Sequence, residues 1–254
     1  MPYFVKEDSI TRVIWGKADT VLFIFAGAAA EFALNKAVDW LYFTGKLPSD
    51  PLGRLFSTVR YARWIVFANQ DQANQAIDQL RQIHQTVEQN RGASIPDWAY
   101  RDVLFMLVYY SIAAHELLER KLSISEKEEV YDVFYRVGQR MGLKALPPTY
   151  AEWLQQRESH LIEDLEPGKY TFDLFKQYKR HLGAVRYKLL TEVQKMLIPP
   201  HAKKLLQMHG ICWLAPAVPL YKILRLINAD RFVKSLLLPP QYKEQINAID
   251  VHRH

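Results

Sequence analysis

The sequence has few of the residues that mark disulfide-rich or metal-stapled proteins. Its 254 residues include one cysteine, Cys212, and only 10 glycines. A single cysteine excludes an internal disulfide framework and a cysteine-rich zinc site, and it is typical of a reducing compartment. Because 49% of the residues are apolar, the composition predicts a globular chain that is long enough to bury a large core.

Long apolar runs are also lacking. Residues 21–34 form the most apolar early stretch, but Glu31 interrupts it and it is too short to span a bilayer. The stretch 211–227 is broken by prolines and bases. Residues 1–8 contain no basic segment followed by an apolar core, so no secretory signal is expected. These absences predict a cytoplasmic protein, at most peripheral to a membrane.

Several common catalytic signatures are missing. The chain contains no glycine-rich phosphate loop, no His-Glu-x-x-His, no Cys-x-x-Cys and no Gly-x-Ser-x-Gly. Their absence removes the usual nucleotide-binding, zinc-peptidase and serine-hydrolase interpretations.

What the chain does have is helical periodicity, while the alternation typical of strands is scarce. Asp50 precedes Pro51 as a helix cap, and Ser123 and Thr149 each stand three residues before a glutamate, the spacing of a capping box. The sequence therefore predicts an all-α fold, a single multi-helix globular domain over residues 1–254. Besides the helices that begin after Ser123 and Thr149, the predicted helices are 51–68, 71–90, 96–120, 170–182, 184–197, 202–208 and 220–227. The Pro199–Pro200 pair is the best point of subdivision within this domain.

Positive charge is concentrated near the end of the chain. Residues 167–254 contain 15 Lys and Arg against 5 Asp and Glu, whereas the first 166 residues contain 18 against 22. Aromatic residues are interleaved with these bases: Tyr170, Phe172, Phe175, Tyr178 and Tyr187. This region forms either an ordinary solvated surface or a docking face for an anionic membrane or an acidic partner. Nucleic acid is disfavoured, because no recognition module is present.

Arg54 and Thr58 are the first candidate site residues. Four residues apart on a predicted helix, they lie one above the other, and Tyr61 and Ile65 extend the same stripe. The apolar face of the helix is centred about a third of a turn away. The guanidinium and the hydroxyl therefore either look into a cavity from the flank of the buried face, or are a snorkelling arginine and a filler threonine.

His84 is the second candidate. It falls inside the apolar face of the predicted helix 71–90 rather than opposite it. A neutral imidazole there needs a hydrogen-bond partner or a metal, because an unsatisfied buried polar group is costly. Both a satisfied core histidine and a metal ligand fit this position.

The other histidines and the cysteine carry weaker signals. His115 follows an apolar stretch and is predicted to be a core residue, with an alternative ligand or a pocket wall left open. Cys212 is predicted to be buried filler. Four histidines in polar or basic surroundings are predicted to be exposed, namely His160, His181, His201 and His209. His252 and His254 belong to a terminus that is expected to be mobile.

Four segments in order resemble the DUF2236 family, which groups the latex-clearing rubber oxygenases with the endoplasmic-reticulum-bound fungal oxygenase of mycophenolic acid biosynthesis. The segments are Trp15-Gly16, Phe-Ala-Gly-Ala-Ala-Ala at 25–30, Asp-Pro-Leu-Gly-Arg-Leu-Phe-Ser-Thr at 50–58, and Ile-His-Gln-Thr-Val at 83–87. The similar region covers about residues 11–199, which leaves residues 200–254 as a basic, helical C-terminal extension.

The resemblance implies a b-type haem in a buried slot between helices. The family's histidine, here His84, would be the proximal ligand of the haem iron. Its arginine and threonine, here Arg54 and Thr58, would line the distal side as catalytic and cofactor-binding residues, and Tyr61 would contact the cofactor from the same stripe. Characterised relatives cleave carbon–carbon double bonds of isoprenoid chains with dioxygen. The chain is therefore expected to be an iron-containing oxidoreductase, a haem b-dependent oxygenase or peroxidase-like protein for an apolar, isoprenoid- or lipid-like substrate and dioxygen or peroxide. The basic region 167–254 would dock it on a membrane.

Departures from the family pattern support an alternative. The distal carboxylate of some relatives has only Asp39 and Glu31 as substitutes. The family's His-Pro, Asp-Pro and Trp-Val-His elements are replaced here by Asn35-Lys36, Asp102-Val103 and Val108-Tyr109-Tyr110. The alternative is a non-catalytic helical module with a degenerate site, which binds haem, a membrane surface or a partner.

Overall fold

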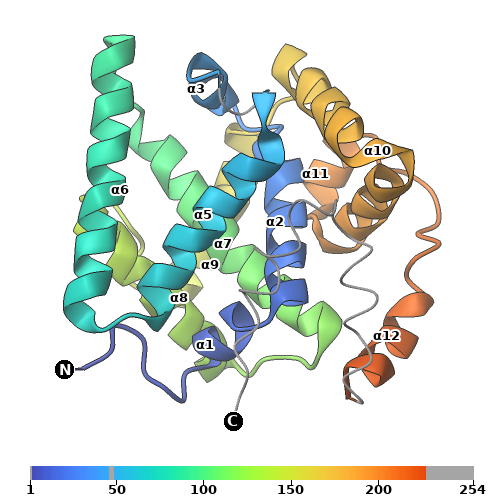
Figure 1. Cartoon of the computed structure of the whole chain (residues 1–254), viewed down its shortest axis with the longest axis horizontal. Helices are drawn as coiled ribbons and strands as arrows, with labels where there is room; N and C mark the ends of the chain where they lie inside the picture. The colour runs from blue at the N-terminus through green and yellow to red at the C-terminus, as the bar shows by residue number, and fades with distance from the viewer. Residues whose placement is uncertain (1, 46–48, 227–254) are drawn as a thin grey trace.

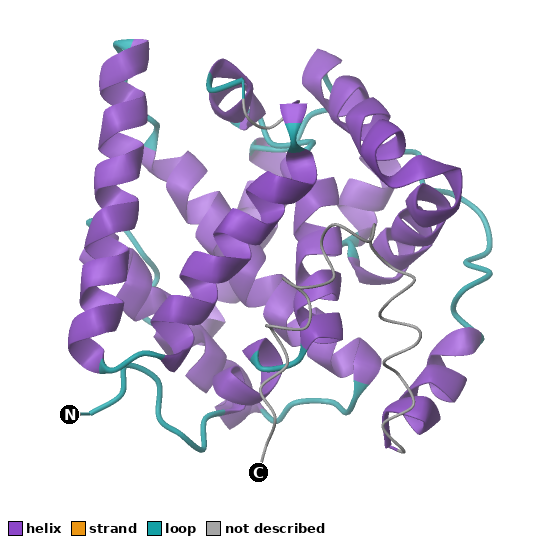
Figure 2. Cartoon of the chain, viewed as in Figure 1, coloured by secondary structure: helices purple, strands orange, loops and turns teal. Residues whose placement is uncertain are grey.

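Every regular element in the described part of the chain is a helix. The computed structural model describes residues 2–45 and 49–226, and no strand is present in these two ranges (Figure 2). The predicted all-α fold, one globular domain of packed helices, is therefore confirmed (Figure 1). Within the described ranges the helices are α1 Ile10–Trp15, α2 Ala18–Phe32, α3 Val38–Phe43, α5 Pro51–Phe67, α6 Gln70–Arg91, α7 Asp97–Leu118, α8 Ile124–Met141, α9 Tyr150–Glu163, α10 Lys169–Leu197, α11 Pro200–Leu205 and α12 Ala217–Leu226.

Helices α2 and α7 form the centre of the molecule, with α6 bordering one side and α10 the other (Figure 1). Their close approach depends on Gly27, because a Cβ at that position would overlap the ring of Tyr110 on α7. The fully buried Trp15 donates from Nε1 to Ser111 Oγ at 3.1 Å, which ties α1 to α7. The core thus follows from apolar faces that meet around one central helix pair.

Helix ends follow the local chemistry that the sequence shows. Asp50 Oδ1 accepts a hydrogen bond from the Gly53 amide at 2.8 Å, and Pro51 opens α5. Ser123 forms both hydrogen bonds of a capping box with Glu126. At the end of α6, Gly92 adopts the left-handed conformation with φ 67°, which favours glycine. The boundaries predicted from these residues agree with the structure to within two residues.

Two predicted helices, 170–182 and 184–197, form one element. Helix α10 runs through both, and at Gly183 the backbone leaves helical geometry with φ 74° and ψ 171°, so the helix is kinked there. Pro200 begins α11, so the proline pair marks a helix boundary as predicted. Of the last predicted helix, 220–227, residue 227 lies outside the described residues. The periodicity does not predict α1 and α3, because six residues complete less than two helical turns.

None of the helices in the described ranges is long and apolar enough to cross a membrane.

Candidate functional site

A cavity of about 690 Å³ lies among α2, α3, α5, α6, α7, α8 and α10. This volume falls within the range of roughly 300–1,000 Å³ that is usual for small-molecule and cofactor sites. Its walls are mainly apolar, and the ionisable or cationic side chains among them are few: Arg54, Arg60, Tyr61, His84, Tyr100, Tyr178 and Arg186. We call this space the central cavity.

All four predicted site residues line the central cavity. Arg54, Thr58 and Tyr61 lie on α5, and His84 lies on α6, the helix that follows and packs against it. The structure thus brings together side chains that the sequence placed on two separate helices. Their positions agree with a cavity-facing stripe rather than with a snorkelling arginine.

His84 is half-buried as a residue, but its Nδ1 atom is buried and forms no hydrogen bond with the described residues. The His84 and Tyr100 rings pack in an edge-to-face arrangement, with the ring centroids 5.2 Å apart and an interplanar angle of 68°. Burial and, to a smaller extent, the positive charge of Arg54 lower the pKa of His84 to about 4, although Glu88 opposes the change. The imidazole is therefore neutral at pH 7, which is the form that binds a metal ion.

Tyr100 and Glu88 form a hydrogen-bonded pair beside His84, which was not predicted from the sequence. The Tyr100 hydroxyl donates to Glu88 Oε1 at 3.3 Å, and the Ile95 amide donates to the same oxygen at 2.8 Å. Burial, followed by the charge of Glu88, raises the pKa of Tyr100. Glu88 stands one turn beyond His84, a local signal for its position, but Tyr100 reaches the ring only through tertiary packing.

The Arg54 guanidinium faces the central cavity without a partner. In the part of the chain that the structure describes, it forms no hydrogen bond and no ion pair. Burial lowers the pKa of Arg54, but from a value so high that the side chain stays cationic at pH 7. Thr58 Oγ1 donates its proton to the Arg54 carbonyl at 3.1 Å, so toward the cavity the hydroxyl can act only as a hydrogen-bond acceptor.

No carboxylate lines the central cavity among the described residues. Asp39 pairs with Arg91 at 2.6 Å, and Glu31 is fully buried in a pair with Arg157 at 2.5 Å. Neither acidic residue therefore stands in for the distal carboxylate of some relatives. The cavity wall is cationic and apolar.

A protein-family model described as "ER-bound oxygenase mpaB/B'/Rubber oxygenase, catalytic domain" matches residues 15–229. The chain belongs to this family. Comparison with curated proteins and with solved structures gives no match. Since the family is an oxygenase catalytic domain, membership implies a small-molecule substrate and dioxygen.

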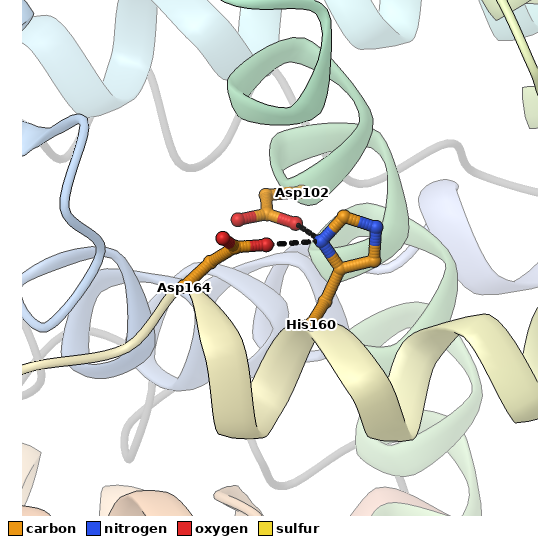
Figure 3. Close-up of side chains that lie close together, drawn as sticks. All are labelled: Asp102, His160 and Asp164. Carbon is orange, nitrogen blue, oxygen red and sulfur yellow. Dashed lines mark hydrogen bonds and ion pairs between the residues drawn. The ribbon is translucent and has the colours of Figure 1, made fainter.

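In this oxygenase domain, His160 is buried, so the prediction that it is exposed is wrong. Only 7% of its surface is accessible, because it shares the inner face of α9 with Trp153 and Arg157. Its Nδ1 contacts carboxylates of Asp102 on α7 and Asp164 at the end of α9 (Figure 3). The sequence contained a partial signal, since His160 and Asp164 are four residues apart.

A further polar residue lies beside this cluster. The Asn35 amide nitrogen donates to Asp102 Oδ2 at 2.6 Å. Neither Asn35 nor Asp102 lines the central cavity.

The remaining predictions about histidine and cysteine have mixed outcomes. His115 is buried as predicted, with 1% of its surface accessible, and lies away from the central cavity. Cys212 is half-buried rather than buried, and its thiol contacts the Glu192 carbonyl at 3.5 Å. His209 is exposed, whereas His181 and His201 are half-buried. His252 and His254 lie outside the described residues.

Proposed function

We propose that this oxygenase domain binds haem b in the central cavity and oxidises an apolar, isoprenoid- or lipid-like substrate with dioxygen or peroxide. The observation that carries the proposal is the neutral imidazole of His84, whose buried Nδ1 has no hydrogen-bond partner among the described residues, on the wall of a large apolar cavity that Arg54 also lines. A buried imidazole nitrogen without a hydrogen bond is costly unless a ligand satisfies it.

The residues present fit this cofactor. Haem needs an apolar slot and a histidine on a rigid element, and His84 lies well inside a 22-residue helix. The negatively charged haem propionates would pair with cations. Two arginines line the same cavity: Arg60, which is exposed, and Arg186, which is half-buried. Haem in this slot supplies the redox chemistry that activates the oxidant.

The side chains around the cavity would hold the cofactor and stabilise the oxidant. His84 would ligate the iron, and the ring contact with Tyr100 would hold the imidazole in position. Arg54 would present positive charge to the cavity, where it can form charge-assisted hydrogen bonds to an anionic oxygen. Thr58 Oγ1 would accept a hydrogen bond from a bound water, and Tyr61 would form part of the cavity wall.

The Asp102–His160–Asp164 cluster is a poor alternative location for the oxidation. Its side chains are 2–16% exposed and do not line the central cavity, so a substrate in that cavity does not reach them. This burial supports the central cavity as the place of the reaction.

Haem reconstitution tests the proposal. The purified protein is expected to develop a Soret band that saturates at one haem per chain. Because the ligand binds only the folded state, haem at 100 times its Kd should stabilise the protein by about 2.7 kcal/mol, which raises the Tm by about 5–10 °C. Absorbance titration and differential scanning calorimetry measure both effects. A non-catalytic module without cofactor predicts neither the band nor the shift.

The described part of the basic region 167–254 shows which bases can face a membrane. Lys222 donates to the Glu119 carbonyl at 2.9 Å, and Arg225 pairs with the buried Asp19 at 2.8 Å, so both hold α12 against the domain. Several bases on α10 are exposed instead, among them Lys176, Lys179 and Arg180. Exposed Phe172 and Val185 lie on the same helix.

We expect α10 to carry any membrane affinity. A triple substitution, Lys176→Glu with Lys179→Glu and Arg180→Glu, is expected to abolish sedimentation with phosphatidylserine-containing vesicles. The affinity of the unaltered protein should fall as salt rises, because about 1 kcal/mol per surface base is electrostatic and is screened. Neutral phosphatidylcholine vesicles are the control. Equal binding of both proteins to both vesicle types would contradict a role for α10.

A further inference from the structure

A buried cluster behind the cavity wall has features of a metal site. Asp102 projects from α7, His160 from α9, and Asp164 from the C-cap of α9. Figure 3 shows both carboxylates pointing at the same ring nitrogen of His160. One ligand atom from each residue lies within 4.8 Å of the other two.

Hydrogen-bond donors do not satisfy this cluster. His160 Nδ1 carries at most one proton, and Asp164 Oδ2 lies 2.5 Å from it in a hydrogen bond. Asn35 serves Asp102 Oδ2 at 2.6 Å. Asp102 Oδ1 also lies within ion-pair distance of His160 Nδ1, but it is buried and has no hydrogen-bond donor of its own among the described residues; Asp102 is only 2% exposed. The arrangement has more acceptors than donors, so it fits a cation better than a set of hydrogen bonds.

The net charge of the cluster also favours a bound cation. Two carboxylates face one imidazole, which supplies at most one positive charge. The nearest arginine on α9 is Arg157, and it is paired with Glu31 at 2.5 Å. A divalent ion with a neutral imidazole would balance Asp102 and Asp164 in a buried environment.

We propose that Asp102, His160 and Asp164 bind a divalent transition-metal ion of the zinc class. One imidazole nitrogen and two carboxylate oxygens are ligands that zinc accepts, with one position left for a water. At metal–ligand distances of about 2.1 Å, tetrahedral ligand atoms stand roughly 3.4 Å apart. The ion would therefore part the two carboxylates from Nδ1 by about 1 Å, which rotation of short aspartate side chains allows.

The ion would stabilise the contact between α7, the end of α9 and the loop after α2, and it would not take part in the oxidation. The loop after α2 already lies against the end of α9, since the Lys36 amide donates to the Asp164 carbonyl at 3.0 Å and the Glu166 amide to the Leu34 carbonyl at 2.8 Å. Asp102 stands on the segment of α7 whose neighbours Ala99 and Val103 line the central cavity. Binding would thus fix the back of the cavity wall.

Metal titration of the full chain tests the site. The protein, freed of any affinity tag and treated with a chelator, is titrated with zinc sulfate in a calorimeter. One saturable equivalent is expected, with a rise in Tm. Asp164→Asn should remove this binding, whereas Asp78→Asn, which alters an exposed aspartate on α6 that pairs with Arg140, should retain it. His84→Ala should also retain it, which separates this site from the proposed haem site.

Failure of the wild type to bind zinc saturably would overturn the proposal, as would unchanged binding in Asp164→Asn. Circular dichroism establishes whether each variant folds. If Asp164→Asn does not fold, a cobalt(II) titration of His84→Ala decides: visible absorption that saturates at one equivalent and is displaced by zinc supports the site, and its absence refutes it.

Discussion

The His84→Ala variant is expected to lose the Soret band that the reconstituted wild type develops, together with the haem-induced rise in Tm. The imidazole is the one unpartnered histidine side chain on the wall of the central cavity among the described residues. Removing it leaves the porphyrin with apolar contacts but without its axial bond. We therefore expect haem affinity to fall by at least about 100-fold, since even the loss of outer-shell support for a metal ligand costs 10–100-fold.

His115→Ala is the matched control. Like His84, His115 lies on a long helix and has a buried Nδ1 without a hydrogen bond among the described residues, but it lies outside the central cavity. Its variant should bind haem as the wild type does. Adding free imidazole to His84→Ala should restore part of the band, because the space vacated by the side chain opens onto the cavity. An unchanged band in His84→Ala would remove the ligand assignment.

Features that depend on short stretches of chain could be predicted from the sequence. Arg54 and Thr58 are four residues apart, and their helix is delimited by Asp50 and Pro51, so their shared stripe follows from helical geometry. His84 lies among apolar residues of a strongly periodic helix, and the structure places it on the cavity. Periodicity locates such side chains because it measures direction around one helix axis.

Features that depend on distant segments could not be predicted in this way. His160 stands among polar neighbours in sequence, but its burial is decided by Asp102 on α7 and by Phe105, whose ring packs edge-on at 5.3 Å. Tyr100 meets His84 only because the start of α7 lies beside α6. An apolar face also has the same sequence pattern whether it meets side chains or a cavity, so the volume of the central cavity was not predictable.

The second large effect is expected at the buried ion pair of Glu31 and Arg157. Glu31 is fully buried, Arg157 is 3% exposed, and the Tyr110 hydroxyl donates to the same Glu31 oxygen at 2.8 Å. Burial opposes the charge of Arg157, but Glu31 outweighs this effect and the pKa of Arg157 is raised. The pair joins α2 to α9 across the central helix α7.

Arg157→Met should destabilise the fold by about 3–5 kcal/mol, because the carboxylate of Glu31 is then left buried without a cation. For a chain of this size the Tm should fall by roughly 6–20 °C. Arg140→Met is the matched control: Arg140 pairs with Asp78 at 2.6 Å, but the two side chains are 40% and 52% exposed. Removing that pair should cost at most about 1 kcal/mol. Urea unfolding followed by circular dichroism measures both.

The double variant Glu31→Gln with Arg157→Met separates the charge from the packing. If the cost of Arg157→Met comes from an uncompensated carboxylate, making residue 31 neutral should recover much of the lost stability, and the double variant should be more stable than Arg157→Met alone. If the cost comes from lost contacts of the arginine stem with Tyr109, whose ring lies 5.2 Å from the guanidinium carbon, the two changes should add. A coupling free energy near zero would thus show that packing, not charge, makes Arg157 important, and that α9 is held to α2 by shape.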